Sequence, residues 1–259
     1  MKAKRKGPES LSCTPVWEIR HSYNIDSLVI GFGYRARSGK DVAVAEIIKQ
    51  RGLLSPEQCV GEEWLWEENR YDIRRYAFAD ALKREVNAAA LAVGGMANLL
   101  TNPNNRFAMC KGYYMDFPEW VQYDPNAPTD DPMCPLGKQR TLLQWWGAEY
   151  RRAQDPDYWV RQLANTIELE KPQVALVSDL RFENEMQFVL QYGEAIRVDR
   201  AGLPAATHIS ETALDDCTDW ALVLENNGTL DEFREGAVTA FDEILNYHKK
   251  FAATNTSLG

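Results

Sequence analysis

The sequence LVIGFGYRARSGKD, residues 28–41, joins an apolar run to a loop that contains glycine. The run from Leu28 to Phe32 predicts a short buried strand. Beyond the loop, apolar residues recur with helical spacing at Val42, Val44, Ala45, Ile47 and Ile48. Gly52 then ends this pattern, as glycine often does after a helix. The stretch therefore predicts a strand, a loop and a helix in direct succession.

The loop itself has the composition of a phosphate-binding loop. Glycine lets backbone N–H groups point inward at an anion, and the start of the following helix adds a favourable field. Lys40 would add a positive charge at the β- and γ-phosphates of ATP. The alternative is a strand–helix turn whose glycines serve only backbone geometry.

The loop departs twice from the usual pattern of Gly, four residues and Gly-Lys-Ser/Thr. Tyr34 stands where the first glycine is expected, and Gly33 comes one position early. Asp41 stands where a hydroxyl group usually holds magnesium. A carboxylate at this position can hold a hydrated Mg²⁺ ion but cannot donate a hydrogen bond to phosphate.

The rest of the chain alternates between apolar runs and amphipathic segments. Further strands are predicted near residues 74–78, 174–178, 195–198 and 221–224. Helices are predicted over 80–91, 138–152 and 182–192, and from about 155 and 229 onward. This order predicts an α/β fold of three layers, with a mostly parallel sheet flanked by helices and an inserted acceptor-binding or lid region.

A length of 259 residues suits one α/β core with a large insertion. Residues 94–136 are rich in Pro, Asn, Tyr, Met and Trp and show weak periodicity, which indicates an insertion. The long loop 200–216 is expected to be a lid, since loops of this length are often functional. The predicted divisions are an N-terminal tail over 1–26, a core over 27–93 and 137–250, and a C-terminal tail over 251–259.

Composition narrows the setting of the protein. The net charge of −9 and the pI near 5.0 argue against a stable nucleic-acid complex. No run of about 18 apolar residues is present, so no membrane span is expected. Five scattered cysteines without a CxxC pair, and three histidines without ligand spacing, favour a reducing cytoplasm over a disulfide or zinc protein. The sequence leaves a homodimer open.

The chain resembles the phage-type deoxynucleoside monophosphate kinases, within the wider group of P-loop nucleoside monophosphate kinases. Those proteins also carry Arg-Ser-Gly-Lys-Asp after the first strand, here residues 37–41. The similarity continues in blocks at 140–149, 157–160, 177–186, 207–211 and 224–230. The order of the blocks is more specific than any block except the loop. Tyr34, the N-terminal tail and the 94–136 insertion depart from the family pattern.

The resemblance implies a set of roles for individual residues. The catalytic residues would be Lys40, Arg181 and Asp179, with Mg²⁺ held by Asp41 and Asp179. ATP would be bound by Gly33, Tyr34, Arg35, Ala36, Arg37, Ser38, Gly39, Lys40, Asp41, Arg200, Asn226 and Asn227. The acceptor would be bound by Asp80, Lys83, Arg140, Gln144, Arg151, His208 and Glu211.

Structural alternatives stand beside these roles. Asp179 and Asp80 have the residue type that caps helices, and Arg181 suits a surface ion pair. The face shared by Arg140, Gln144 and Arg151 could be solvated, while His208 could orient the lid without touching a ligand. Asn-Gly at 227–228 is a strong turn signal. Trp145 and Trp146 are expected to lie in the core rather than to stack on a base.

The predicted reaction is ATP plus a deoxynucleoside monophosphate giving ADP plus the diphosphate, with ATP and Mg²⁺ as cofactors. Such an enzyme would supply nucleotides in the cytoplasm, which would be that of a host if a phage encodes the chain. One rival is a P-loop kinase of another small acceptor, such as dephospho-coenzyme A. A second rival is a non-catalytic nucleotide-binding module, which Tyr34 favours and the set of Lys40, Asp179 and Arg181 disfavours.

Overall fold

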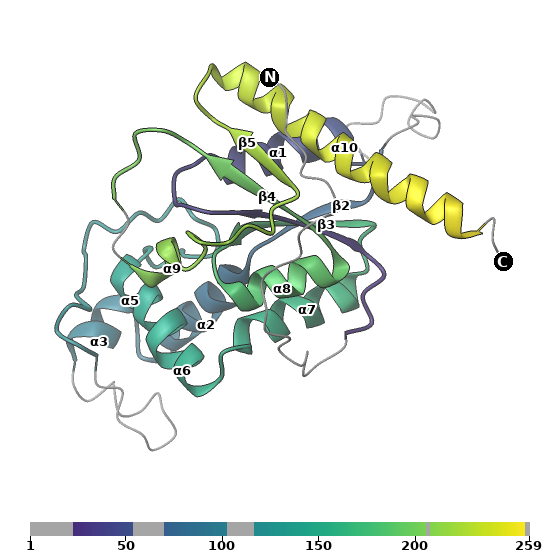
Figure 1. The fold of residues 1–259 in the computed structure, drawn as a ribbon. Coiled ribbons are helices and arrows are strands. Elements are labelled where there is room, and N and C mark those ends of the chain that lie inside the picture. Colours follow the sequence, from purple (N-terminus) through teal and green to yellow (C-terminus); the bar gives the residue numbers. More distant parts are fainter. Residues whose placement is uncertain (1–22, 54–69, 103–116, 206–207, 257–259) are drawn as a thin grey trace, which may run out of the picture. The chain divides into compact units, whose positions relative to one another are not determined.

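The computed structural model describes residues 23–53, 70–102, 117–205 and 208–256. The chain divides into two compact units (Figure 1). One unit combines Met1–Tyr76 with Ala164–Gly259, and the other is Ala77–Leu163. Most of the predicted tail over 1–26 lies outside the described residues. No helix in the described ranges is long and apolar enough to cross a membrane.

The first unit is built on a five-stranded sheet in the order β2-β3-β1-β4-β5. Its strands are β1 (Leu28–Gly33), β2 (Ile73–Tyr76), β3 (Val174–Leu180), β4 (Gly193–Asp199) and β5 (Leu222–Glu225). Every neighbouring pair is parallel. The predicted α/β class and parallel sheet are thereby confirmed. Parallel strands bring their carboxyl ends to one edge, which is where ligands bind in open sheets of this kind.

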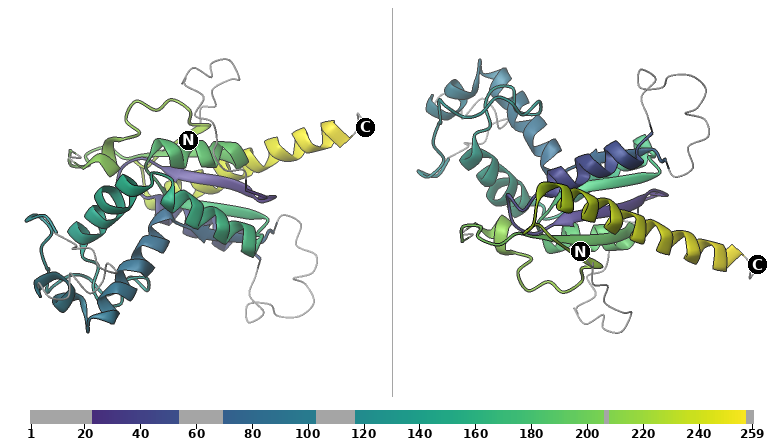
Figure 2. Two further views of the ribbon diagram at one scale, coloured as in Figure 1. Left: turned by 90° about the horizontal axis from the view of Figure 1, so that it is seen from below. Right: turned by 90° about the horizontal axis from the view of Figure 1, so that it is seen from above.

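Helices cover both faces of this sheet. On one face lie α1 (Lys40–Arg51) and α10 (Leu230–Thr256), which pack against each other and lie side by side in the right view of Figure 2. Ile30 and Phe32 of β1 point to that side, into a core shared with both helices. On the other face α8 (Glu183–Tyr192) packs on β1 and β4. Such burial on both faces explains the apolar runs of the central strands β1 and β3, whereas the edge strand β2 (IRRY) exposes both of its arginines.

A β-bulge interrupts β3 at its carboxyl end. Gly31 pairs with Val177 and Gly33 pairs with Leu180, so three steps along β3 match two along β1. Leu180 lies against the α8 face beside Gly31, although Leu176, four residues earlier, belongs to the α1 face. Strict alternation would put both on one face, so the bulge falls between them. A bulge changes the direction in which the side chains of the strand point. Asp179 lies within this bulge, between Val177 and Leu180.

The second unit is helical. Its elements are α2 (Phe78–Ala92), α3 (Met96–Thr101), α5 (Arg140–Gln144), the π-helix η2 (Trp145–Arg151), α6 (Arg152–Gln154) and the start of α7 (Tyr158–Glu170). Helix α2 packs on α3, α5 and η2. Trp145 and Trp146 are buried, which confirms the expectation that they belong to a core.

Several predicted boundaries differ from the structure. The strand expected over 74–78 ends at Tyr76 because Phe78 already begins α2, and a short apolar run does not reveal where a strand ends. The helix expected over 138–152 is not one α-helix, since its middle is π-helical. The second unit is larger than the predicted insertion over 94–136, because α2 and the 140–163 helices pack with it.

The C-terminal and lid regions also carry more helix than expected. Helix α10 continues to Thr256 into the predicted tail over 251–259. The loop 200–216 contains the short helix α9 (Ile209–Thr212). The expected start of the last helix is confirmed by a capping box: the Thr229 N–H donates to Glu232 Oε2 at 2.8 Å, and the Glu232 N–H donates to Thr229 Oγ1 at 3.3 Å.

Candidate nucleotide-binding site

The loop between β1 and α1 has the backbone geometry of an anion cradle. Tyr34, Arg37 and Gly39 all have positive φ, at 92°, 63° and 112°. Within the described chain, no acceptor is found for the backbone N–H groups of residues 35–39. The first N–H groups of α1 add further donors, because a helix leaves those groups without partners. The loop therefore presents several donors that a phosphate chain can take.

Lys40 lies across the start of this loop. Its Nζ atom donates to the Arg35 carbonyl at 2.5 Å and to the Tyr34 carbonyl at 3.3 Å, and it lies 3.3 Å from Ser38 Oγ. The side chain is buried, with a residue exposure of 6%. The ammonium group is thus held by two carbonyl oxygens and a hydroxyl group of the loop.

Charged groups converge on Lys40. Burial, and after it the positive charge of Arg181, lowers the pKa of Lys40 from 10.5 to about 8. The carboxylates of Asp41, Asp179 and Glu211 act in the opposite direction on the same pKa. The structure therefore brings together five of the predicted site residues at one end of the sheet. An added anion would favour the charged form of Lys40.

The carboxylates at this site match the chemistry that Mg²⁺ requires. Asp41 is exposed in the first turn of α1, and Asp179 lies in the bulged end of β3. Across the described ranges, no three His, Cys, Asp or Glu side chains form a group that could hold a metal. Mg²⁺ commonly uses one or two carboxylates and completes its shell with water and substrate phosphates. The donor set fits that mode rather than an all-protein site.

Phe182 is the N-cap of helix α8, and Glu185 reaches back to it from the first turn. The Glu185 Oε2 atom accepts hydrogen bonds from the N–H groups of Arg181 at 2.7 Å and of Phe182 at 3.1 Å. Asp179 lies three residues before Phe182 and is therefore not the N-cap residue of this helix. The guanidinium of Arg181 makes a long contact of 3.5 Å from Nη1 to the Ser210 carbonyl, which links it to the lid loop.

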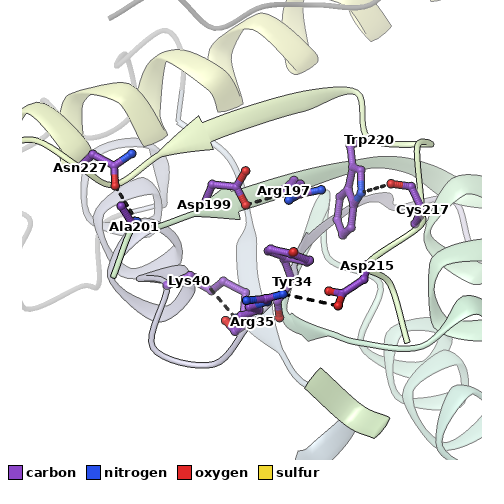
Figure 3. Close-up of polar contacts among 11 residues, drawn as sticks. Tyr34, Arg35, Lys40, Arg197, Asp199, Ala201, Asp215, Cys217, Trp220 and Asn227 are labelled. Atoms are coloured by element: carbon purple, nitrogen blue, oxygen red, sulfur yellow. Dashed lines mark hydrogen bonds and ion pairs between the residues drawn. The ribbon is translucent and has the colours of Figure 1, made fainter. Parts of the chain in front are cut away.

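Tyr34 lies among charged and aromatic side chains at the position where the usual loop pattern has glycine (Figure 3). The guanidinium carbon of Arg197 lies 3.9 Å from the centre of its ring. Arg197 in turn donates from Nε to Asp199 Oδ1 at 2.8 Å. Trp220 fills the space beside Gly33, where an added Cβ atom would lie 2.5 Å from the indole. Sequence reasoning did not identify Arg197 or Trp220, because no local pattern joins them to residue 34.

The loop 200–216, which was predicted to be a lid, contacts the loop between β1 and α1 at two points. Arg35 Nη2 lies 3.4 Å from Asp215 Oδ2, and Arg200 Nη1 lies 3.5 Å from the Arg37 carbonyl. His208 caps α9, with its Nδ1 atom accepting from the Ser210 N–H at 3.2 Å. That contact joins His208 to a residue two positions further along the same loop.

The loop after β5 is tied to its neighbours through both asparagines. The Asn226 amide donates from Nδ2 to the Ser38 carbonyl at 2.8 Å. Asn227 Oδ1 accepts from the Ala201 N–H at 2.7 Å, a contact drawn in Figure 3. These two residues therefore connect the last strand to the phosphate loop and to the start of the lid loop.

The remaining residues that were predicted to bind the acceptor lie in the second unit. Lys83 Nζ lies 3.0 Å from Asp131 Oδ2 and 3.9 Å from Asp80 Oδ1. Asp80 belongs to the first turn of α2 but is not its N-cap, which is Ala77. The Lys83–Asp131 pair attaches the segment around residue 131 to helix α2.

Arg151 is bound to a carboxylate in this unit. Glu85 Oε1 accepts from Arg151 Nε at 2.6 Å and from Trp146 Nε1 at 3.0 Å, and Glu85 Oε2 accepts from the Tyr158 hydroxyl at 3.1 Å. The predicted common face of Arg140, Gln144 and Arg151 assumed α-helical spacing. The π-helix changes that spacing between Gln144 and Arg151, so the assumption does not hold.

Comparison with known proteins gives a partial match. The mimivirus protein named "Putative deoxynucleotide monophosphate kinase" (Acanthamoeba polyphaga mimivirus) is 34% identical over 87 residues. That alignment covers 32% of this chain and 43% of the mimivirus protein, so it spans less than half of the relative's length. The resemblance noted in the sequence thus extends to a curated protein of that name. No protein-family profile matches the chain.

Among solved structures, a dephospho-CoA kinase from Campylobacter jejuni aligns with 84% of this chain and 98% of its own. The identity is 10% and the TM-score is 0.39. At these values the alignment says nothing about substrate.

Proposed function

We propose that the protein is an ATP-dependent kinase that transfers the γ-phosphate to a deoxynucleoside monophosphate. The proposal rests mainly on the loop between β1 and α1: the backbone N–H groups of residues 35–39 have no acceptor within the described chain, and the buried Lys40 follows them and contacts the loop carbonyls of Tyr34 and Arg35. A loop of donors with a lysine at its end suits a nucleotide's phosphate chain. The partial similarity to the mimivirus protein supports the choice of acceptor.

Phosphoryl transfer needs positioning and neutralisation of charge more than covalent help from the protein. Lys40 would bind the β- and γ-phosphates, giving up its contacts with the Tyr34 and Arg35 carbonyls or sharing them. Arg181, which acts on the pKa of Lys40, would neutralise charge on the transferring group. An acceptor monophosphate is already an anion, so no strong general base is needed.

Asp41 and Asp179 would hold Mg²⁺, which neutralises phosphate charge when bound. Arg200, Asn226 and Asn227 would complete the ATP site beside the loop at 33–41. Within the second unit, the residues proposed to bind the acceptor are Asp80, Lys83, Arg140, Gln144 and Arg151. Within the first unit, His208 and Glu211 are proposed for the same role.

The test is release of ADP from Mg·ATP in the presence of each of the four deoxynucleoside monophosphates. Dephospho-coenzyme A serves as a fifth acceptor, and Lys40→Ala serves as the inactive control. Acceptor-dependent ADP with one or more of the monophosphates, lost in Lys40→Ala, is the expected result. ADP formed only with dephospho-coenzyme A would assign a different acceptor. ATP binding without any ADP would favour a non-catalytic module.

A further inference from the structure

The side chain of Asn226 spans from the last strand to the phosphate loop. It follows β5 in sequence, and its backbone N–H donates to the Asp199 carbonyl at the end of β4 at 2.7 Å. From this anchored position Nδ2 donates to the Ser38 carbonyl at 2.8 Å. Ser38 is completely buried, so this carbonyl has little access to water as another donor.

This hydrogen bond fixes the orientation of a whole peptide unit. In a trans peptide the C=O and the following N–H point in opposite directions, and the described chain contains no cis peptide bond. Because the Ser38 carbonyl points at Asn226, the Gly39 N–H points away from it. That N–H is one of the loop donors for which the described chain offers no acceptor. Asn226 therefore aims a donor without touching what the donor binds.

Gly39 shows that Asn226 is packed tightly against the loop. A Cβ atom added at Gly39 would lie 2.5 Å from Asn226 Nδ2 and 3.0 Å from the Phe233 ring. Glycine at this position thus serves two needs, the positive φ of 112° and the close approach of the amide. The amide nitrogen of Asn226 is engaged by the protein and fills the glycine's open side.

We infer that Asn226 is a positioning residue for the triphosphate chain and does not read the base. This inference rests on the proposed function, since it assumes that the loop binds a nucleotide. Asn226 should therefore affect the binding of any polyphosphate of suitable length, with or without an attached base. Loss of the Asn226 donor frees the Ser38–Gly39 peptide to rotate and weakens phosphate binding equally for every base.

The test compares the dissociation constants of ATP, GTP and inorganic tripolyphosphate by calorimetry in wild type, Asn226→Ala and Asn226→Asp. Asn226→Asp keeps the shape but places an acceptor against the Ser38 carbonyl. The matched control is Gln50→Ala, which removes another amide donor of the same unit, the 2.8 Å bond from Gln50 Nε2 to Glu46 Oε1 on helix α1. Thermal unfolding of each variant verifies that the folded protein is being titrated.

Both Asn226 variants are expected to weaken all three ligands by one common factor, roughly five- to tenfold, while the Gln50→Ala constants stay at wild-type values. Weakening of ATP alone would assign Asn226 to base recognition and overturn the inference. Unchanged constants in folded variants would also overturn it, leaving the proposed kinase activity intact. Wild-type protein that binds no polyphosphate would refute both, whereas binding without phosphoryl transfer would refute the proposed function alone.

Discussion

The guanidinium carbon of Arg197 lies 3.9 Å from the centre of the Tyr34 ring, and the backbone of Tyr34 is left-handed with φ of 92°. A tyrosine in this conformation costs on the order of 1 kcal/mol. A partly desolvated cation–π contact returns about 1–2 kcal/mol. The contact thus explains how a tyrosine occupies a position where the usual loop pattern has glycine.

A double-mutant cycle between these residues tests the compensation. Tyr34→Ala is expected to destabilise the protein by about 1–2 kcal/mol, because it keeps the strain and loses the contact. Tyr34→Gly relieves the strain and is expected to fall about 1 kcal/mol closer to wild type. Denaturant unfolding with Arg197→Ala in both backgrounds measures the coupling. Effects of Tyr34→Ala and Arg197→Ala that simply add would show that the ring and the guanidinium are not coupled.

Lys40 predicts a distinctive dependence of stability on pH. Its pKa is lowered from 10.5 to about 8 on folding, so between these values the unfolded chain binds more protons than the folded one. The stability of wild type relative to Lys40→Met should therefore rise from pH 8 to pH 10.5, by on the order of 3 kcal/mol if the full shift operates. Below pH 8 the difference should be flat. A difference that falls over this range would mean that the folded protein stabilises the ammonium group.

Nucleotide binding should couple to the same proton. Phosphate favours the charged form of Lys40, so binding at about pH 8.5 is expected to take up a fraction of a proton. Calorimetry of ATP binding in two buffers of different ionisation enthalpy gives this number directly. Lys40→Met should abolish the uptake along with most of the affinity. Equal enthalpies in both buffers, in protein that binds ATP, would indicate that Lys40 does not meet the phosphates.

Gly39 can be tested against a second glycine with positive φ. Gly39→Ala is expected to weaken polyphosphate binding at least tenfold, because the new Cβ atom would clash with Asn226 at 2.5 Å. Gly95 of the second unit has φ of 125° and no atom within 4 Å of an added Cβ, so Gly95→Ala isolates the backbone strain. Both variants are expected to lose stability, but only Gly39→Ala is expected to lose polyphosphate binding. Unchanged binding in Gly39→Ala would show that the loop tolerates the displacement.

The carboxylate of Glu85 should be a major source of stability in the second unit. Glu85→Gln removes the negative charge opposite Arg151 and replaces one of the two oxygens that accept hydrogen bonds from Trp146 and Tyr158. The free energy of unfolding should fall by about 1–3 kcal/mol. The control is Glu149, an exposed residue of the π-helix that contains Arg151. Glu149→Gln is expected to change stability by less than about 0.5 kcal/mol. Tryptophan fluorescence during denaturation reports the transition. Equal effects of the two substitutions would show that the hydrogen bonds of Glu85 contribute little to the stability of the second unit.

The sequence contained enough information to predict the sheet but not its long-range contacts. The central strands β1 and β3 correspond to apolar runs, because burial on both faces leaves a pattern that can be recognised without knowing the neighbouring strand, whereas the edge strand β2 carries two exposed arginines. The phosphate loop was predicted from glycine and lysine placed between such a run and an amphipathic helix. The Tyr34–Arg197 and Ser38–Asn226 contacts join residues far apart in the chain, and no local periodicity encodes such pairs.

The helix around residue 145 shows a second limit. Apolar spacing predicts a helix there, but an α-helix and a π-helix differ by a fraction of a residue per turn over only seven residues. Placing Arg151 on the face of Arg140 required the α-helical value. In the structure Arg151 donates a hydrogen bond to Glu85 of α2, and no local sequence pattern connects these two residues. The direction in which each side chain of this helix points was therefore harder to predict than the helix itself.

The central claim is tested most directly by following the γ-phosphate itself. ATP labelled at the γ-position is incubated with the protein, Mg²⁺ and each deoxynucleoside monophosphate, and the products are separated by chromatography. We predict that the label appears on a deoxynucleoside diphosphate and that Lys40→Ala abolishes its transfer. Label that remains on ATP, or is released only as inorganic phosphate, with every monophosphate would contradict the account.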